Sequence, residues 1–377
     1  MPPEQYVDLL IREIRGRASE VRSGLRGQKI DTIYFGGGTP SLIEPPLILT
    51  LITELANAGL VLKAEGEFTL EIDPRTVDEA RLDRYLEIGV NRFSVGAQTF
   101  NPRLLQIAGR EHSADDTVKL LSLLQAKRVN YTFDLLFALP TQTLAEVRAD
   151  VARALEFAPA HISTYCLTVG DHHPMAKGRA PEEEQVEMFA AIDADLEAAG
   201  VLRYEISNYA RPGFESRHNH LYWTDQNYWS LGTGAHSYFN SAFAPEYDWG
   251  FRFWNEPSLP LYERSIKEMD ALSKTHGVWN FGRDLPARSI ERLARHQALT
   301  DFSHTALRLQ VGLSANALRL KFGEAILGRV QEICEKLIDR GLLQKVGDNW
   351  RLTAAGRVVA NQVFMQLTFL EEELHGL

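Results

Sequence analysis

This sequence contains very little cysteine. Only Cys166 and Cys334 occur in 377 residues, and they lie far apart in the chain. Two such thiols exclude the disulfide framework that stabilises small secreted domains. Each is more simply a small buried hydrophobic residue. We therefore expect a reducing compartment, the cytoplasm.

Long apolar segments are missing as well. No run of hydrophobic residues approaches the ~20 that a membrane-spanning helix needs. The N-terminal stretch MPPEQYVDLLIREIRGRASE mixes charged and apolar residues, so it lacks the basic start and apolar block of a signal peptide. These absences predict a protein that is neither secreted nor integral to a membrane.

Positive charge is in deficit. The 40 lysines and arginines are outnumbered by 50 aspartates and glutamates, which gives a net charge of −10. A protein that holds nucleic acid through phosphate contacts needs a basic face, so we expect no nucleic-acid partner. The hydrophobic fraction of 45% is that of an ordinary globular protein, and the length suffices for two domains.

Helix and strand patterns alternate regularly as far as residue 207. After an amphipathic helix at 4–18, we expect strands at 30–35, 68–72, 92–95, 131–136, 161–167 and 203–207, and helices from about 46 and at 77–88, 114–127, 144–156 and 181–199. This alternation is typical of βα units around a parallel sheet, in which ligands bind at the carboxyl ends of the strands. The chain opens on a helix where a barrel opens on a strand, so we predict an α/β fold with a partial (β/α) barrel.

The rest of the chain has two other patterns. Residues 208–300 are rich in aromatic residues and histidine. From 301 the sequence predicts helices at 301–310, 314–322 and 325–341, a short apolar hairpin at 343–352 and a last helix at 354–371. We therefore expect three segments: a partial barrel at 1–207, a connecting region at 208–300 and a small winged-helix-like domain at 301–377.

The sharpest motif is the glycine turn Gly36-Gly37-Gly38-Thr39, which follows the first strand. Glycines let backbone approach a ligand, so that N–H groups bind a carboxylate or phosphate and C=O groups accept from an ammonium. No Gly-Lys-Ser/Thr follows, which excludes a phosphate-binding P-loop. The alternative interpretation is a tight turn without a ligand.

Polar residues also stand at the ends of the later strands. These are Glu71, Gln98, Arg110 and Asp134. A carboxylate among apolar strand residues loses several kcal/mol of hydration (~2–7) unless it is paired. One interpretation is a ligand site at this edge of the sheet. The other is a set of structural pairs, for example Asp134 with Arg92 or Arg110.

Several ordered segments together resemble a known family. They are GGGTPSL from Gly36, Glu71-x-Asp73-Pro74, NRFSVGAQTF from Asn91, Gly109-Arg110, FDLLFALPTQT from Phe133, YEISNYA from Tyr204 and HNHLYW from His218. In this order they resemble the oxygen-independent coproporphyrinogen III oxidase-like radical S-adenosylmethionine (SAM) family. The resemblance runs from about residue 5 to the C-terminus, and its strength lies in the number and order of the motifs.

The resemblance implies a SAM site. Gly36, Gly37, Gly38 and Thr39 would contact the methionine amino group of SAM. Glu71 would hold its ribose, and Gln98, Arg110 and Asp134 would line the rest of the pocket. SAM carries an ammonium, a carboxylate, a ribose diol and a sulfonium, so its site needs both hydrogen-bond acceptors and donors.

Within the family, the segment from His218 to Tyr222 fits the His-Asn-x-x-Tyr signature of the haem-chaperone (HemW-type) branch. His218, Asn219 and Tyr222 are then haem-binding residues, with His218 as the candidate axial ligand of the iron. The implied function is to bind haem and deliver it to acceptor proteins, among which membrane respiratory enzymes are candidates. Without the resemblance, the simpler interpretation of His218 is a packed, hydrogen-bonded histidine.

Two other functions stay open. One is an oxygen-independent coproporphyrinogen III oxidase or dehydrogenase, in which a SAM-derived radical abstracts hydrogen from propionate side chains. The other is an interaction protein that keeps the barrel as a scaffold. The His-Asn-x-x-Tyr match favours the chaperone.

The chain departs from the family in one respect. The family holds a [4Fe–4S] cluster through Cys-x-x-x-Cys-x-x-Cys, which follows the first barrel strand, and no such motif occurs here. The chain as given is therefore expected to lack the ligands of the cluster and to be inactive in radical chemistry. We favour truncation of a longer sequence over true loss, because the SAM-facing residues remain.

Overall fold

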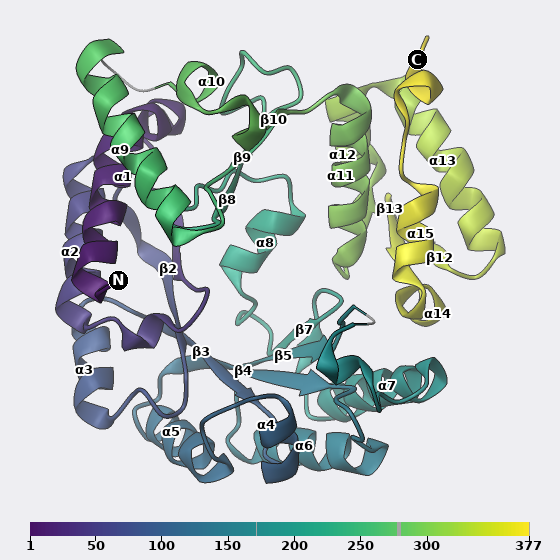
Figure 1. The fold of residues 1–377 in the computed structure, drawn as a ribbon. Coiled ribbons are helices and arrows are strands. Elements are labelled where there is room, and N and C mark those ends of the chain that lie inside the picture. The colour runs from purple at the N-terminus through teal and green to yellow at the C-terminus, as the bar shows by residue number, and fades with distance from the viewer. Residues whose placement is uncertain (171, 277–279, 377) are drawn as a thin grey trace. The chain divides into compact units, whose positions relative to one another are not determined.

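The computed structural model describes residues 1–170, 172–276 and 280–376. The chain divides into two compact units. The first, here called the sheet unit, comprises residues 32–45 and 67–216. The second, here called the composite unit, comprises residues 1–31, 46–66 and 217–377. Figure 1 shows the elements of both, and each unit is described by itself.

The sheet unit is built on a seven-stranded sheet in the order β1-β2-β3-β4-β5-β7-β6. Its strands are β1 (Ile30–Phe35), β2 (Leu62–Ile72), β3 (Arg92–Gln98), β4 (Asn130–Phe137), β5 (His161–Cys166), β6 (Leu202–Arg203) and β7 (Asn208–Ala210). The neighbours from β2 to β5 are parallel, whereas β7 runs antiparallel to β5 and β6. The predicted α/β fold with a mostly parallel sheet is confirmed.

Helices connect these strands, as the alternating pattern predicted. They are α3 (Glu79–Glu87), α4 (Pro102–Ile107), α5 (Ala114–Ala126), α6 (Leu144–Glu156) and α7 (Glu182–Ala198), with 3₁₀ turns at Pro40–Leu42 after β1 and at Pro174–Ala176 after β5. In Figure 1, α4, α5 and α6 lie along one side of β3 and β4. Local sequence sets the start of several helices: Thr143 and Glu146 form a capping box at α6, and Asp78 caps α3.

The strand predicted at 203–207 is wrong. The chain forms a short hairpin there, with β6 ending at Arg203 and β7 beginning at Asn208. The Glu205 carboxylate closes the turn, because Oε1 accepts hydrogen bonds from the backbone N–H of Ser207 and the side chain of Asn208. A side chain that satisfies the turn's own donors competes with an extended strand.

The composite unit begins with the long helix α1 (Pro3–Leu25), which packs against α9 (Leu259–His276). It also contains α2 (Pro45–Asn57), α8 (Arg217–Trp223) and α10 (Phe281–Asp284). A three-stranded antiparallel sheet joins β8 (His236–Phe239), β9 (Phe251–Trp254) and β10 (Ile290–Arg292) in the order β10-β9-β8. The aromatic residues of the connecting region form the core here, with the Phe253 and Phe281 rings 4.6 Å apart.

The C-terminal segment has the element order of a winged helix. Its elements are α11 (Arg295–Arg308), β11 (Leu313–Ser314), α12 (Ala315–Phe322), α13 (Glu324–Asp339), β12 (Leu343–Val346) and β13 (Asn349–Leu352). The three strands pair antiparallel in the order β11-β13-β12. The helical domain and its apolar hairpin were predicted correctly.

The last predicted helix, at 354–371, is wrong in its extent. It is divided into α14 (Ala354–Val358) and α15 (Ala360–Gln366), and a 3₁₀ turn follows at Glu371–Leu374. The backbone leaves helical geometry at Val359, where φ is −111° and ψ is 32°. Two successive β-branched residues, Val358 and Val359, disfavour an uninterrupted helix at this point.

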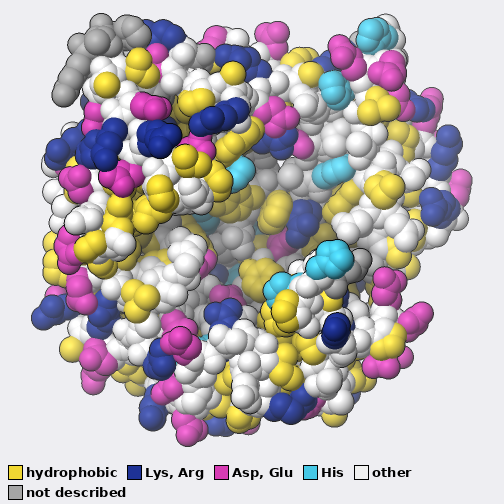
Figure 2. Space-filling view, viewed as in Figure 1, with side chains coloured by type: hydrophobic (Ala, Val, Ile, Leu, Met, Phe, Trp, Pro, Cys, Tyr) yellow, Lys and Arg dark blue, Asp and Glu magenta, His cyan; other side chains and the backbone are white. Residues whose placement is uncertain are grey.

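Two general features bear on the partners. None of the helices in residues 1–170, 172–276 and 280–376 combines the length and apolar character needed to cross a membrane. On the face that Figure 2 presents, basic and acidic side chains are interspersed rather than segregated. The two units follow spatial contacts rather than chain order, and the three-segment division at residues 207 and 300 stays a prediction.

Candidate functional site

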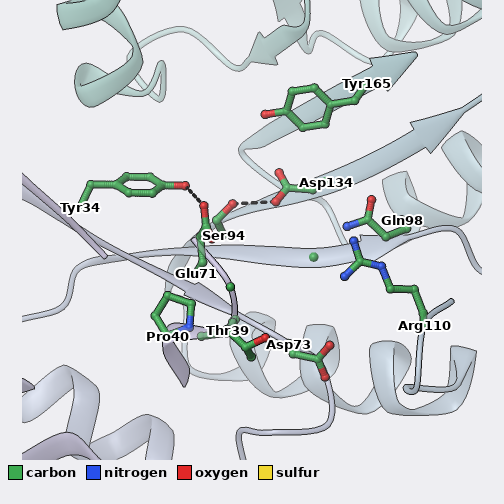
Figure 3. Close-up of a pocket in the computed structure, with 13 residues that line it drawn as sticks. Tyr34, Thr39, Pro40, Glu71, Asp73, Ser94, Gln98, Arg110, Asp134 and Tyr165 are labelled. Carbon is green, nitrogen blue, oxygen red and sulfur yellow. Dashed lines mark hydrogen bonds between the residues drawn. The ribbon is translucent and has the colours of Figure 1, made fainter. Parts of the chain in front are cut away.

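Six of the eight residues predicted to bind SAM line one hollow in the sheet unit. This hollow lies at the carboxyl ends of the strands. They are Gly38, Thr39, Glu71, Gln98, Arg110 and Asp134. The hollow has a volume of about 840 Å³ including the part that opens to solvent. Its other lining residues are Tyr34, Pro40, Ile72, Asp73, Ser94, Gly96 and Tyr165. Figure 3 shows Tyr34 and Glu71 on one side of it, and Gln98 and Arg110 on the other.

The glycine turn positions the Glu71 carboxylate. Tyr34 Oη–H donates to Glu71 Oε1 at 2.7 Å, and the Gly37 backbone N–H donates to Oε2 at 3.0 Å (Figure 3 shows the first bond). A Cβ on Gly36 would lie 2.4 Å from the Tyr34 ring and 2.7 Å from Glu71 Oε1, so a side chain there would displace at least one of these groups. Gly36 and Gly37 thus do not line the hollow, but they hold Glu71 at its wall.

Asp134 lies deep in the hollow on β4. Ser94 Oγ donates to Asp134 Oδ2 at 2.8 Å, whereas Oδ1 is inaccessible to solvent and has no hydrogen-bond partner among the described residues. Burial raises the pKa of Asp134 to about 6, which the Ser94 hydrogen bond opposes. Across the described ranges, Asp134 makes no ion pair with Arg92 or Arg110. Arg92 Nη1 instead donates to the Phe214 carbonyl at 3.3 Å.

Gln98 and Arg110 form the opposite wall (Figure 3). Gln98 ends β3 in the left-handed region at φ +67°, and the register of β3 on β4 shifts between Val95 and Gln98. Such irregularities at a strand end change the direction of a side chain and are common at functional sites. Arg110 is exposed after α4 and supplies a positive charge, while Glu71, Asp73 and Asp134 supply acceptors.

The prediction missed Tyr34, Ser94 and Tyr165 as site residues. Ser94 had a signal in the sequence, because residues at i, i+2 and i+4 of a strand share one face, and Gln98 had been singled out on the same strand. Ser94, Gly96 and Gln98 do line the hollow together. Tyr165 is the next-to-last residue of β5, so the strand-end argument that selected Asp134 applied equally to it. Burial is the largest cause that raises the pKa of Tyr165, so it remains a phenol.

The predicted haem-binding residues lie in the composite unit, on α8. His218 and Tyr222 are one helical turn apart, with His218 Nε2 and Tyr222 Oη 2.9 Å apart and the two rings perpendicular. Asn219 lies on the same helix. The sequence analysis predicted no helix in this segment. The Tyr222 ring also meets Tyr228 edge-on at 4.7 Å. All three predicted residues are partly buried.

The side chains offer no match to an iron–sulfur cluster. Within the described residues, no three His, Cys, Asp or Glu side chains gather to hold a metal ion. The expectation of a small buried residue is confirmed for Cys334, which lies in α13, but it is wrong for Cys166, which is exposed on β5. Burial raises the pKa of the Cys334 thiol to about 12, so this thiol is protonated.

Family sequence patterns and individual similar proteins both relate this chain to radical SAM proteins. The Radical SAM superfamily pattern matches residues 3–154, and the HemN C-terminal domain matches residues 293–359. The Heme chaperone HemW of Lactococcus lactis is 36% identical over 373 residues, which cover 96% of this chain and 89% of that protein. The Heme chaperone HemW of Bacillus subtilis is 29% identical over 375 residues, 96% of this chain and 91% of that one.

A solved structure shares the fold. Coproporphyrinogen III oxidase (HemN) from Escherichia coli, a radical SAM enzyme, superposes with a TM-score of 0.76. The superposition covers 97% of this chain and 83% of that one, at 19% sequence identity. At this identity the likeness concerns the architecture alone.

Proposed function

Because the chain belongs to the HemW family of radical SAM proteins, we propose that it binds haem and delivers it to acceptor proteins. The observation that carries this proposal is the similarity to proteins named Heme chaperone HemW, 36% over 96% of the chain. The acceptor proteins, membrane respiratory enzymes among the candidates, and the cytoplasmic location stay predictions.

The residues of α8 fit haem in their chemistry. A neutral imidazole is a common haem ligand, and flat aromatic rings suit a macrocycle. His218 Nε2 shares a hydrogen bond with Tyr222 Oη in this structure, and coordination of iron by Nε2 would replace that bond. Asn219, on the next position of the helix, adds an amide that donates and accepts.

Haem titration of the purified chain tests this proposal. We expect a Soret band on titration with ferric haem, and we expect His218→Ala to weaken binding by about tenfold or more and to shift that band. His220→Ala is the matched control, because His220 stands on the same short helix. If His220→Ala changes the band and His218→Ala does not, the assignment of His218 is wrong. If neither His218→Ala nor Tyr222→Phe changes affinity or spectrum, the haem role of α8 fails.

We further propose that the hollow of the sheet unit binds SAM. Its donors and acceptors match the ligand: Glu71 for the ribose diol, Asp134 with its unused buried oxygen for a cationic group, and Arg110 for the carboxylate. SAM supplies a sulfonium-activated adenosyl group when bound. The side chains present do not fit the cluster of the family, so the proposal extends to binding alone.

Isothermal titration calorimetry with SAM distinguishes this proposal from the scaffold alternative. Saturable heats that disappear in Glu71→Ala would support a SAM site. Their absence in the unmodified chain would favour an interaction protein that keeps the barrel only as a framework. The oxidase alternative rests on a shared fold at 19% identity. Anaerobic conversion of coproporphyrinogen III by a version of this chain supplied with a Cys-x-x-x-Cys-x-x-Cys segment would favour it over the chaperone.

A further inference from the structure

A buried histidine contacts two segments that contribute residues to the lining of the hollow. The side chain of His112 is 0% exposed and stands just before α5. Its Nδ1 lies 3.3 Å from Asp73 Oδ2, and its Nε2 lies 3.2 Å from the Ala97 carbonyl oxygen. Asp73 follows β2 and lines the hollow, and Ala97 immediately precedes Gln98, which lines it too. One imidazole thus joins the ends of β2 and β3.

The partners of His112 determine its charge. A backbone carbonyl oxygen only accepts hydrogen bonds, and so does an ionised carboxylate. A neutral imidazole has one N–H, so with these two partners one of its contacts would place a lone pair against a lone pair. Either His112 is an imidazolium that donates twice, or Asp73 carries the proton and donates to Nδ1. The hydrogen bond from His112 is the largest cause that lowers the pKa of Asp73, which favours the ion pair.

The neighbouring charges agree with an imidazolium. Asp115 and Asp116 occupy the first turn of α5, and Asp116 interacts electrostatically with His112. These carboxylates compensate for the unfavourable position of a cation near a helix N-terminus. Arg110 also lowers the pKa of Asp73, but less than His112 does, and it is exposed to solvent, where its effect is screened.

A second buried histidine in the same unit provides a contrast. His161 Nδ1 lies 2.6 Å from Thr132 Oγ1, and its Nε2 lies 2.8 Å from Tyr204 Oη. Hydroxyl groups both donate and accept, so a neutral imidazole satisfies both contacts. Burial lowers the pKa of His161 well below its ordinary value. His112 and His161 are therefore equally buried, but their partners demand different protonation states.

We propose that His112, protonated on both ring nitrogens, is a positioning residue that fixes Asp73 and the end of β3 in the geometry that binds SAM. Asp73 Oδ1 accepts from the Arg75 backbone N–H at 3.0 Å, so with His112 on Oδ2 the carboxylate is held at both oxygens. The contact with Ala97 supports the strand end at which Gln98 adopts its positive φ. This inference rests on the proposed SAM site, but the charge of His112 is testable without the ligand.

The first experiment measures the charge. In ¹H–¹⁵N spectra of the full chain labelled at histidine ring nitrogens, near neutral pH, His112 is expected to carry protons on both nitrogens and His161 on one. Assignment follows from His112→Gln and His161→Gln. A neutral His112 with one protonated nitrogen overturns the inference. Loss of the second ring proton of His112 in Asp73→Asn supports the inference, because a neutral amide stabilises an imidazolium less than the carboxylate of Asp73 does.

The second experiment measures positioning by calorimetry with SAM. His112→Gln and Asp73→Asn are each expected to weaken SAM binding by about tenfold, and the double variant to weaken it little further, since both remove one ion pair. His161→Gln is the control: it removes a buried histidine of the same unit and leaves SAM affinity unchanged. Equal SAM affinity in His112→Gln and the unmodified chain overturns the inference. If the unmodified chain binds no SAM, the proposed SAM site fails, and the spectra alone decide the charge of His112.

Discussion

Asp134 is a residue whose charged form lowers the stability of the fold but suits the proposed ligand site. Its carboxyl group lies in an apolar strand, bonded to Ser94 on one oxygen and without a partner on the other among the described residues. Burial raises its pKa to about 6 from the usual 3.8. An acid whose pKa is raised in the folded state stabilises that state only while it is protonated. Strongly perturbed acids of this kind are concentrated at functional sites.

The variant Asp134→Asn tests this opposition. The unmodified chain should lose stability as the pH rises from about 4 to about 6, because ionisation is cheaper in the unfolded chain. The asparagine does not ionise, so above that range the sheet unit of the variant should be more stable by up to about 3 kcal/mol and should bind SAM more weakly. Urea unfolding across this pH range checks the stability. Parallel pH profiles for the two proteins would contradict the assignment.

At the scale of elements, the site is formed where strands end. The glycine turn after β1 bonds to Glu71 on β2, and β3 contributes Ser94 and Gln98. The sequence located these strand ends correctly because apolar runs followed by polar residues are strong local signals. It did not show which side chains face the hollow, because that depends on register and on the irregular end of β3.

Gly36→Ala is the element-scale test. The new methyl group would overlap the Tyr34 ring and the Glu71 carboxylate, and the turn should shift at a cost of about 1–3 kcal/mol. SAM affinity, measured by calorimetry, should fall with it. Gly213→Ala is the control, since Gly213 lies in the same unit at φ +86° with open space around it and bears only backbone strain. Unchanged SAM affinity in Gly36→Ala would refute the role of the turn.

At the scale of the molecule, the N-terminal helix belongs to the same unit as the second half of the chain. Glu13 on α1 is fully buried and pairs with Arg17. Its oxygens also accept from Tyr262 Oη at 2.6 Å, Asn255 Nδ2 at 2.8 Å and the Gly232 backbone N–H at 3.0 Å. These partners are more than two hundred positions away in sequence. This cluster joins segments that no local pattern connects.

Glu13→Ala should destabilise the composite unit by about 3–5 kcal/mol, because Arg17 keeps a buried charge without its carboxylate. Thermal unfolding followed by circular dichroism measures the effect. Glu54→Ala removes the surface ion pair of Arg15 on the same helix, and it should change the midpoint little. Comparable shifts in the two variants would mean that the cluster contributes no more than a surface pair.

The sequence determined the elements and the chemistry. Apolar periodicity located the five principal strands and most helices, and the strands with the turns after them supplied five residues of the hollow, to which Arg110 adds a sixth from the segment after α4. These features are encoded within a few neighbouring residues, where side-chain period and capping act. The ordered motifs also identified the family, since they depend on residue type and spacing alone.

Only the tertiary structure decided which residues act together. Tyr34, Ser94 and His112 join the site through bonds to Glu71, Asp134 and Asp73, each more than thirty positions away. The charge inferred for His112 depends on two acceptors from different segments, and the burial of Glu13 depends on residues from the distant half of the chain. Such pairings arise when segments distant in sequence pack together, so no local pattern carries them.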